Sequence, residues 1–230
     1  MKLFLSRLLL DPRSGQVQRE LARPYELHRT ILRAFPAAGE GGPGRVLFRV
    51  ETPRGAGPIP VLVQSDRPPD WAQLRVSGSY LWRSAEPRGS CVESKEVRLE
   101  VRAGQALRFR LRANPTKKLV QGPRLGLLHE AEQLAWLARK GEAGGFRPLA
   151  VTLRTEGMGE IRGPTESNAS PIRMLSVRFE GRLAVTEPSA FLRTVASGVG
   201  SGKGFGFGLL SLAPDGGGGG ASESPPGPSV

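Results

Sequence analysis

Cysteine, histidine and aromatic side chains are scarce in this chain. Its 230 residues include 1 Cys and 2 His, and aromatic residues make up 6%. One cysteine excludes an intramolecular disulfide framework, and so few ligands exclude a thiolate-rich zinc or iron–sulfur site. We therefore expect no metal and no cofactor, and the lack of disulfides is typical of a reducing cytoplasm.

Long apolar runs are also missing, whereas positive charge is in excess. No run reaches the roughly 18 apolar residues of a membrane span, so we expect neither a membrane anchor nor a signal peptide. The chain has 33 Lys and Arg against 21 Asp and Glu, a formal net charge of +12. This balance predicts an acidic partner. Nucleic acid fits better than anionic lipid, because the basic residues fall on expected strands and loops and not on a basic amphipathic helix.

The first half of the chain has the order of a β-α-β-β-α-β unit. The nearly continuous apolar run at residues 3–10 is typical of a strand covered on both faces. Pro24 suits the first position of a helix, where its missing N–H is harmless, so we expect a helix at residues 24–35. Two further strands are expected at residues 46–50 and 61–64, and a short helix at residues 70–74. A linker is expected at residues 83–94, and the closing strand at either residues 80–82 or residues 97–101.

An alternating strand opens the second half. Leu107, Phe109 and Leu111 alternate with arginines, so a strand here packs one face and presents three guanidinium groups on the other. An amphipathic helix follows at residues 127–138 and stops at Gly141. Two hairpin strands are then expected at residues 149–154 and 175–179. A helix at residues 188–196 and a last strand at residues 207–212 complete the second half.

Together these orders predict an α+β protein with two tandem ferredoxin-like (RRM-like) βαββαβ domains. We place the N-terminal domain at residues 1–98 and the C-terminal domain at residues 99–213. Residues 214–230 are rich in glycine, proline and serine and bury too little apolar surface to fold, so we expect a disordered tail.

The strongest candidate for chemistry lies at the start of the first expected helix. Tyr25 and His28 are three residues apart and therefore share one helix face, with Arg29 and Arg33 at its cationic edge. A tyrosine and a histidine near a helix start more often pack or cap than catalyse. However, the chain has only 2 Tyr and 2 His, and one of each lies here beside arginines. The candidate catalytic residues are therefore Tyr25, His28 and Arg33.

A second motif has glycine at every second position of residues 198–208, around Lys203. Such a loop lets backbone N–H groups approach a phosphate closely. It is not a Walker loop, because a helix precedes it and a strand follows it. Apolar residues interleave with the glycines, so packing and nucleic-acid binding are equally supported. For binding, the candidates are Gly200, Gly202 and Lys203.

Basic residues also form two one-sided tracks. Residues 107–124 hold six cations and no acid, and a basic hairpin is expected between residues 151 and 179. Charge runs are usually solvated surfaces, but a run that continues along a strand can follow a phosphate backbone. Aromatic residues are too few to stack unpaired bases, which favours a structured RNA hairpin. The candidate RNA-binding residues on these tracks and beside His28 are Arg29, Arg108, Arg110, Arg112, Lys117, Lys118, Arg124, Arg154, Arg162 and Arg173.

Three of these segments together resemble the CasE family, the type I-E CRISPR repeat-processing endoribonucleases. They are Arg-Pro-Tyr-Glu-Leu-His-Arg-Thr at residues 23–30, the basic run at residues 108–118 and the glycine-rich run at residues 198–211. The resemblance spans residues 2–213. It implies two ferredoxin-like domains and metal-independent cleavage of precursor CRISPR RNA at the 3′ base of the repeat hairpin. The partners that it implies are the repeat hairpin, the mature crRNA and the other Cascade subunits.

The resemblance assigns Tyr25 and His28 to the catalytic pair, and Arg33 falls where a cation assists in some relatives. In that reaction the RNA 2′-OH attacks the adjacent phosphorus, leaving a 2′,3′-cyclic phosphate and a 5′-OH. An imidazole titrates near about 6.5, so His28 can protonate the leaving oxygen or take the 2′ proton, and we favour the acid role. A phenol is a poor base at neutral pH, so Tyr25 is expected to position the reacting groups. Arg29, Arg33 and Lys203 would stabilise the developing charge.

A non-catalytic scaffold that binds structured RNA is the alternative hypothesis. It would share the architecture and the basic surface, so composition does not separate it from the enzyme. The Tyr25 and His28 pair is the feature that favours the enzyme.

Overall fold

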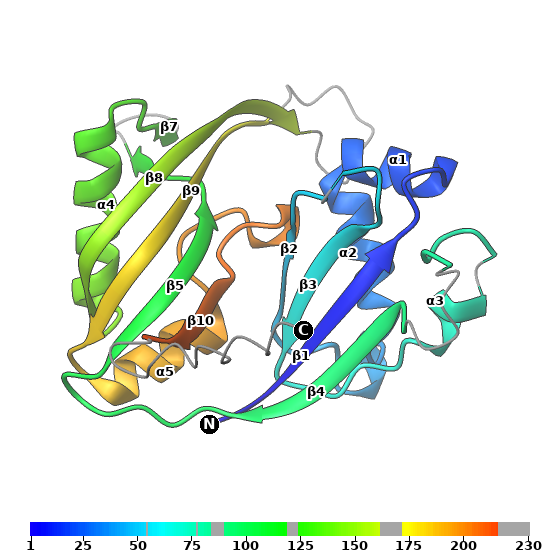
Figure 1. The fold of residues 1–230 in the computed structure, drawn as a ribbon, viewed down its shortest axis with the longest axis horizontal. Helices are drawn as coiled ribbons and strands as arrows, with labels where there is room; N and C mark the ends of the chain where they lie inside the picture. The colour runs from blue at the N-terminus through cyan, green and yellow to red at the C-terminus, as the bar shows by residue number, and fades with distance from the viewer. Residues whose placement is uncertain (54, 77, 84–89, 119–123, 162–171, 216–230) are drawn as a thin grey trace, which may run out of the picture.

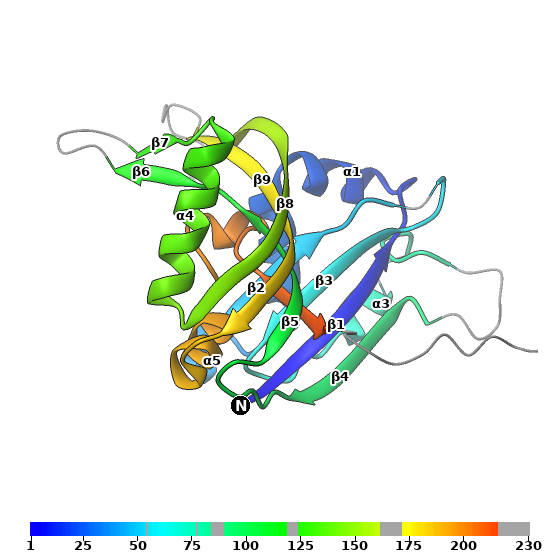
Figure 2. The same ribbon diagram turned by 60° about the vertical axis from the view of Figure 1, so that its left-hand side comes forward.

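Two four-stranded antiparallel sheets form the body of the protein, and a two-stranded hairpin is attached to the second. In Figures 1 and 2 the two large sheets lie next to each other, and α4 runs along the second sheet on the side away from the first. The computed structural model describes residues 1–53, 55–76, 78–83, 90–118, 124–161 and 172–215.

The first sheet has the strand order β2-β3-β1-β4, with every neighbouring pair antiparallel. This is a ferredoxin-like arrangement, in which the first and third strands are central. Its strands are β1 (Lys2–Leu10), β2 (Val46–Val50), β3 (Ile59–Ser65) and β4 (Val92–Arg98). The helical elements of this half are α1 (Gly15–Ala22), α2 (Pro24–Leu32), the 3-10 helix η1 (Ala38–Glu40) and α3 (Ala72–Val76).

This half differs from the sequence prediction most at α1 and β4. The helix α1 was not expected, and the Ser14 side chain caps it by accepting a hydrogen bond from the Val17 N–H. The closing strand β4 begins inside the expected linker, five residues before the later of the two expected places, and overlaps that place only at Val97 and Arg98. At the earlier place, Leu81 forms only an isolated bridge with Leu10. The strand was hard to recognise because β4 is an edge strand whose side chains are mostly charged and exposed.

The second sheet repeats the arrangement, with the order β10-β5-β9-β8. The α+β fold with tandem ferredoxin-like units is therefore confirmed. Its strands are β5 (Ala106–Ala113), β8 (Phe146–Ile161), β9 (Ile172–Val185) and β10 (Leu210–Pro214). The other elements of this half are β6 (Thr116–Lys118), β7 (Arg124–Gly126), α4 (Glu130–Ala143), α5 (Pro188–Ser197) and the 3-10 helix η2 (Lys203–Phe205).

The alternation predicted for β5 is confirmed. Leu107, Phe109 and Leu111 are buried, and the intervening arginines lie on the opposite face of the sheet. Gly141 does not stop α4, which continues to Ala143. A Cβ on Gly141 would lie 2.5 Å from the carbonyl oxygen of Phe146, so this glycine allows α4 to pack closely against the following strand.

The expected division between residues 98 and 99 remains a proposal. Residues 216–230 of the expected tail lie outside the described residues. None of the helices in the described ranges is both long enough and apolar enough to cross a membrane.

Buried Arg49 on β2 joins the two sheets. Its side chain is 3% exposed, and its Nη1 atom donates to the carbonyl oxygens of Arg110 at 3.2 Å and Leu209 at 3.1 Å. Its Nη2 atom donates to the Ser211 hydroxyl at 2.9 Å and pairs with the Glu51 carboxylate at 2.6 Å. The guanidinium is therefore both neutralised and hydrogen-bonded, which is the condition for keeping a charge in a protein interior.

We expect Arg49→Met to lower the free energy of unfolding by about 3 kcal/mol, because breaking a buried ion pair leaves a carboxylate with less compensation. Arg7→Met is the matched control. Arg7 on β1 pairs with Glu93 on β4 at 2.8 Å, but both side chains are about half exposed. Such exposed ion pairs contribute at most about 1 kcal/mol to the free energy of unfolding. Chemical denaturation measures both variants, and equal losses would contradict the role given to Arg49.

Candidate active site

One face of α2 presents Tyr25 and His28, as their spacing predicts. Their ring centroids lie 6.2 Å apart at an interplanar angle of 55°, and both side chains are partly buried. This face contacts η2 in the glycine-rich loop, which comes from the other end of the chain. In Figure 1 the loop is the orange segment between α5 and β10 that reaches across to β2. Two motifs almost 180 positions apart therefore meet at one place.

The loop and β2 enclose the two rings. His28 stacks on Phe48 of β2, with centroids 5.7 Å apart and planes at 11°. A Cβ on Gly204 would lie 3.3 Å from Cδ2 of His28, so a larger residue there would press on the imidazole. Phe205 follows directly, and its ring lies 6.0 Å from that of Tyr25. The position of the pair therefore depends on the second half of the chain.

Burial lowers the pKa of His28 below its ordinary value. Its Nδ1 atom is fully buried, and no group in the described part of the chain forms a hydrogen bond with it. The imidazolium carries a proton on each nitrogen, so the missing partner also disfavours the charged form. The neutral imidazole is therefore the resting form near pH 7, and Nε2 is the nitrogen that remains for a ligand.

Buried Glu20 on α1 fixes the orientation of α2. Its Oε1 atom accepts hydrogen bonds from the Thr30 hydroxyl at 2.8 Å and from the Gln16 amide at 2.9 Å, and the Tyr80 phenol donates to Oε2. Burial and the contact with Glu20 raise the pKa of Tyr80, which keeps the phenol protonated. Thr30 lies two residues beyond His28, so this network holds the helix that carries the imidazole.

Arg29 on α2 and Arg33, the residue that caps its C-terminus, lie in different places. Arg29 is exposed and pairs with Glu26 at 3.2 Å. Arg33 follows His28 by five residues, about 140° around the helix, and its charge acts on the pKa of Tyr80. The structure therefore brings Tyr25 and His28 together but does not place Arg33, which is exposed, on the face that carries His28. Its catalytic role remains a prediction.

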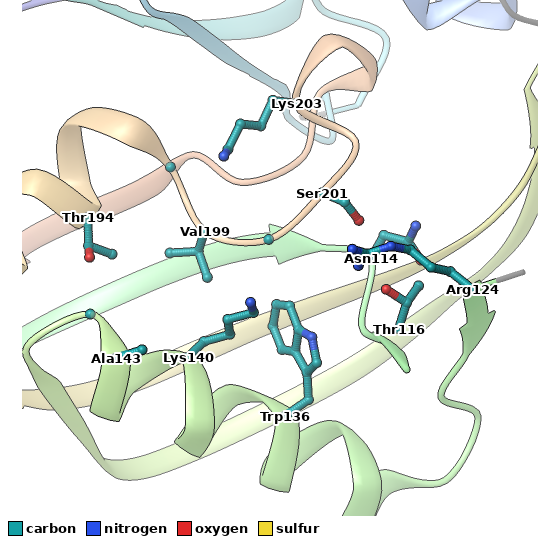
Figure 3. A pocket seen from close by; sticks show the side chains of 13 residues that line it. Asn114, Thr116, Arg124, Trp136, Lys140, Ala143, Thr194, Val199, Ser201 and Lys203 are labelled. Carbon is teal, nitrogen blue, oxygen red and sulfur yellow. The ribbon is translucent and has the colours of Figure 1, made fainter. Parts of the chain in front are cut away.

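The glycine-rich loop does not aim Lys203 at His28. In Figure 3 the Lys203 side chain extends into a pocket that Lys140 and Arg124 also line. A Cβ on Gly200 would lie 3.0 Å from the Trp136 ring, and both Gly200 and Gly202 have φ near +80°. These two glycines are therefore needed for the loop's own conformation and packing.

The arginines of β5 share the open face of the second sheet with acidic residues. Arg110 pairs with Glu180 at 2.8 Å and with Glu51 at 3.2 Å, while Arg112 pairs with Glu156 at 2.8 Å. Arg108 lies on the same face and is exposed. Two of the three guanidinium groups predicted to follow an RNA backbone are thus already partnered within the protein.

The other predicted RNA-binding residues lie on the two hairpins. Lys117 and Lys118 on β6 and Arg124 on β7 are exposed, and Lys118 lies directly opposite Arg124. Like charges in that position destabilise a hairpin, and an anion between them would relieve the repulsion. Figure 2 shows this hairpin projecting from the body of the protein. Arg154 and Arg173 are exposed on β8 and β9, and Arg162 lies outside the described residues.

Sequence reasoning missed Phe48 and Glu20, because no local spacing connects either residue to α2. The alternating glycines of residues 198–208 were a usable signal for Gly204, since the small residue indicates a close approach. Within the described ranges, no group of three or more His, Cys, Asp or Glu side chains is placed to hold a metal ion.

The fold and this site define a class of protein, in which the glycine-rich loop of a second ferredoxin-like unit closes over a tyrosine and a histidine from the first. A family model described as "CRISPR associated protein" matches residues 3–214, and the chain belongs to this family.

Two curated relatives and one solved structure place the chain within the family. It is 40% identical over 207 residues to the "CRISPR-associated endoribonuclease Cse3" of Thermus thermophilus, covering 86% of this chain and 93% of that one. It is 31% identical over 194 residues to the "CRISPR system Cascade subunit CasE" of Escherichia coli, covering 76% and 84%. A structure of Thermus thermophilus Cse3 bound to an RNA representing a pre-cleavage complex matches with a TM-score of 0.80 and 40% identity, covering 93% of this chain and all of that one (100%).

Gly204→Ala tests the contact between the loop and His28. The added methyl group would lie 3.3 Å from the imidazole, so we expect the ring to move and its NMR signals to shift. Gly39→Ala is the matched control, because Gly39 also lies in a 3-10 helix but has nothing within 4 Å of the place that a methyl group would take. Neither glycine has a left-handed φ, so both variants should fold. Unchanged His28 signals in Gly204→Ala would contradict the packing described here.

Proposed function

We propose that this chain is an endoribonuclease that cleaves precursor CRISPR RNA at the 3′ base of the repeat hairpin. It keeps the mature crRNA and works as a subunit of the Cascade complex, in the cytoplasm where the precursor is transcribed. The observation that carries the proposal is the Tyr25 and His28 pair enclosed by the glycine-rich loop. The names of the relatives support it, since one is called an endoribonuclease and the other a Cascade subunit.

RNA carries its own nucleophile for this cleavage. The 2′ oxygen forms a bond to the adjacent phosphorus while the bond from phosphorus to the 5′ oxygen breaks. A base accepts the 2′ proton, and the 5′ oxygen gains a proton as it leaves. The products are a 2′,3′-cyclic phosphate and a 5′-OH, and the step consumes neither water nor a metal-bound nucleophile.

His28 is the base in this proposal. Burial keeps the imidazole neutral, and in the tautomer that carries its proton on Nδ1 the unprotonated Nε2 can accept the 2′ proton. This reverses the acid role that the sequence favoured. The Tyr25 phenol lies beside the imidazole and can donate a hydrogen bond to the reacting phosphate. Arg29 is exposed and only loosely paired with Glu26, so it is free to exchange that carboxylate for the phosphate.

Recognition of the hairpin uses exposed cations on the two hairpins of the second half. An A-form stem is read mainly through its backbone and shape, which suits projecting basic strands. Of the residues predicted to bind RNA, Lys117, Lys118, Arg124, Arg154 and Arg173 meet this requirement.

Cleavage of a repeat hairpin in excess chelator tests the enzyme against the scaffold. We expect the wild type to cut the RNA, and His28→Ala to lose roughly 10² to 10⁴ in rate while binding the hairpin with affinity within a few-fold of wild type. A hairpin that lacks the 2′-OH at the cut position should be bound but not cleaved. If the wild type leaves every RNA intact, the scaffold alternative is correct.

The pH dependence of cleavage distinguishes the two roles of His28. The base role requires the neutral imidazole, so the second-order rate constant should rise with pH through the lowered pKa of His28 and level off by neutral pH, with its midpoint below about 6.5. In the acid role the imidazolium is the active form, so the rate constant would fall as pH rises, and this fall would begin below about pH 6.5. An NMR titration of the His28 ring supplies the pKa for comparison.

A further inference from the structure

A cationic pocket of about 370 Å³ lies beside the active site (Figure 3). Lys203 lines this pocket, while the next residue, Gly204, contacts His28. The pocket is therefore one residue along the glycine-rich loop from the imidazole. Its walls come from the loop, from α4 and from Thr194 on α5. Residues just after β5, on β6 and on β7 complete the lining, namely Asn114, Thr116 and Arg124.

The charges in the pocket are unbalanced. Arg124, Lys140 and Lys203 all line it, and none of its described lining residues is acidic. Burial and the charges of Arg45 and Lys140 lower the pKa of Lys203, so the cations repel one another in the absence of a counter-charge. Arg110 and Arg112 of β5, in contrast, have carboxylate partners at contact distance.

Hydrogen-bond donors face the same space. Asn114 is 5% exposed, and its Oδ1 atom accepts the Leu175 N–H at 3.2 Å, which leaves the Nδ2 group for a ligand. The hydroxyl-bearing residues Thr116 and Ser201 line the pocket as well, as Figure 3 shows. Trp136 forms a rigid wall, because its ring stacks on Phe179 at 6.1 Å. Cations and neutral donors around a rigid wall suit an oxyanion that carries no proton.

We propose that this pocket binds one backbone phosphate of the RNA strand, within a few nucleotides of the scissile phosphate, with Lys140 as a ligand. The inference rests on the proposed function and adds a second phosphate site to it. The pocket is larger than a phosphate group and leaves room for the adjoining ribose. Holding a neighbouring phosphate would fix the strand on both sides of the loop and so align the 2′ oxygen at His28.

Lys140→Ala and Arg139→Ala form a matched pair of variants. The two residues are neighbours on α4, both are exposed, and each substitution removes one positive charge, but only Lys140 lines the pocket. With a hairpin made uncleavable by a 2′-deoxy sugar at the cut position, we expect Lys140→Ala to weaken binding about five- to tenfold. We also expect it to make the salt slope of the affinity shallower by about 1. Arg139→Ala should change affinity less than twofold.

Neutral methylphosphonates, placed one at a time around the cut, then locate the phosphate. At one position the neutral linkage should weaken the binding of RNA to the wild type as much as Lys140→Ala weakens the binding of the unmodified RNA. The same linkage should cause no further loss of affinity in Lys140→Ala. Equal effects of the two alanine variants, or the absence of any coupled position, would overturn the inference. A wild type that cleaves the hairpin normally in those cases leaves the proposed function intact, whereas a wild type that neither binds nor cleaves it rejects both.

Discussion

Arg49 donates hydrogen bonds from the first sheet to the backbone of the second, at Arg110 and Leu209, and its charge is balanced by Glu51. The residue before it, Phe48, stacks on His28, and the residue before Leu209, Gly208, ends the glycine-rich loop. One buried guanidinium therefore holds the aromatic support of the imidazole and the base of the loop that covers it. Gln64 adds a second link, since its Nε2 atom donates to the Val195 carbonyl on α5 at 2.8 Å. The candidate active site depends on the joined sheets, because neither half of the fold alone carries both sides of it.

The positive charge of the chain is distributed in two different ways. On the open face of the second sheet, Arg110 and Arg112 pair with carboxylates and hold strands and sheets together. On the hairpin of β6 and β7 and in the pocket at the glycine-rich loop, cations face solvent or one another. Because paired charges are already satisfied, the second group is the one that an anionic partner stabilises most. Net charge thus indicates a polyanion, and the pairing pattern indicates where it lies.

Local patterns were sufficient for most elements and for the central pair of the site. The alternation in β5, the proline start of α2 and the apolar run of β1 each follow from short-range geometry. The pairing of Tyr25 with His28 also follows, because three-residue spacing on a helix is itself a contact rule. The edge strand β4 was misplaced because an exposed charged strand has no hydrophobic period to detect. Arg33 shows the limit of helical spacing, since this exposed residue lies about 140° around the helix from His28.

Sequence patterns alone predicted the two ferredoxin-like units, the helix face shared by the candidate catalytic side chains and the family to which the motifs belong. All three depend on the order and periodicity of residues close together in the chain. The tertiary structure alone decided that Phe48, Gly204 and Phe205 enclose the pair, that burial favours a neutral His28, and that Lys203 faces a separate cationic pocket. These features arise from contacts between residues distant in sequence. Burial and charge pairing are set by what packs against a group, and no local spacing encodes that.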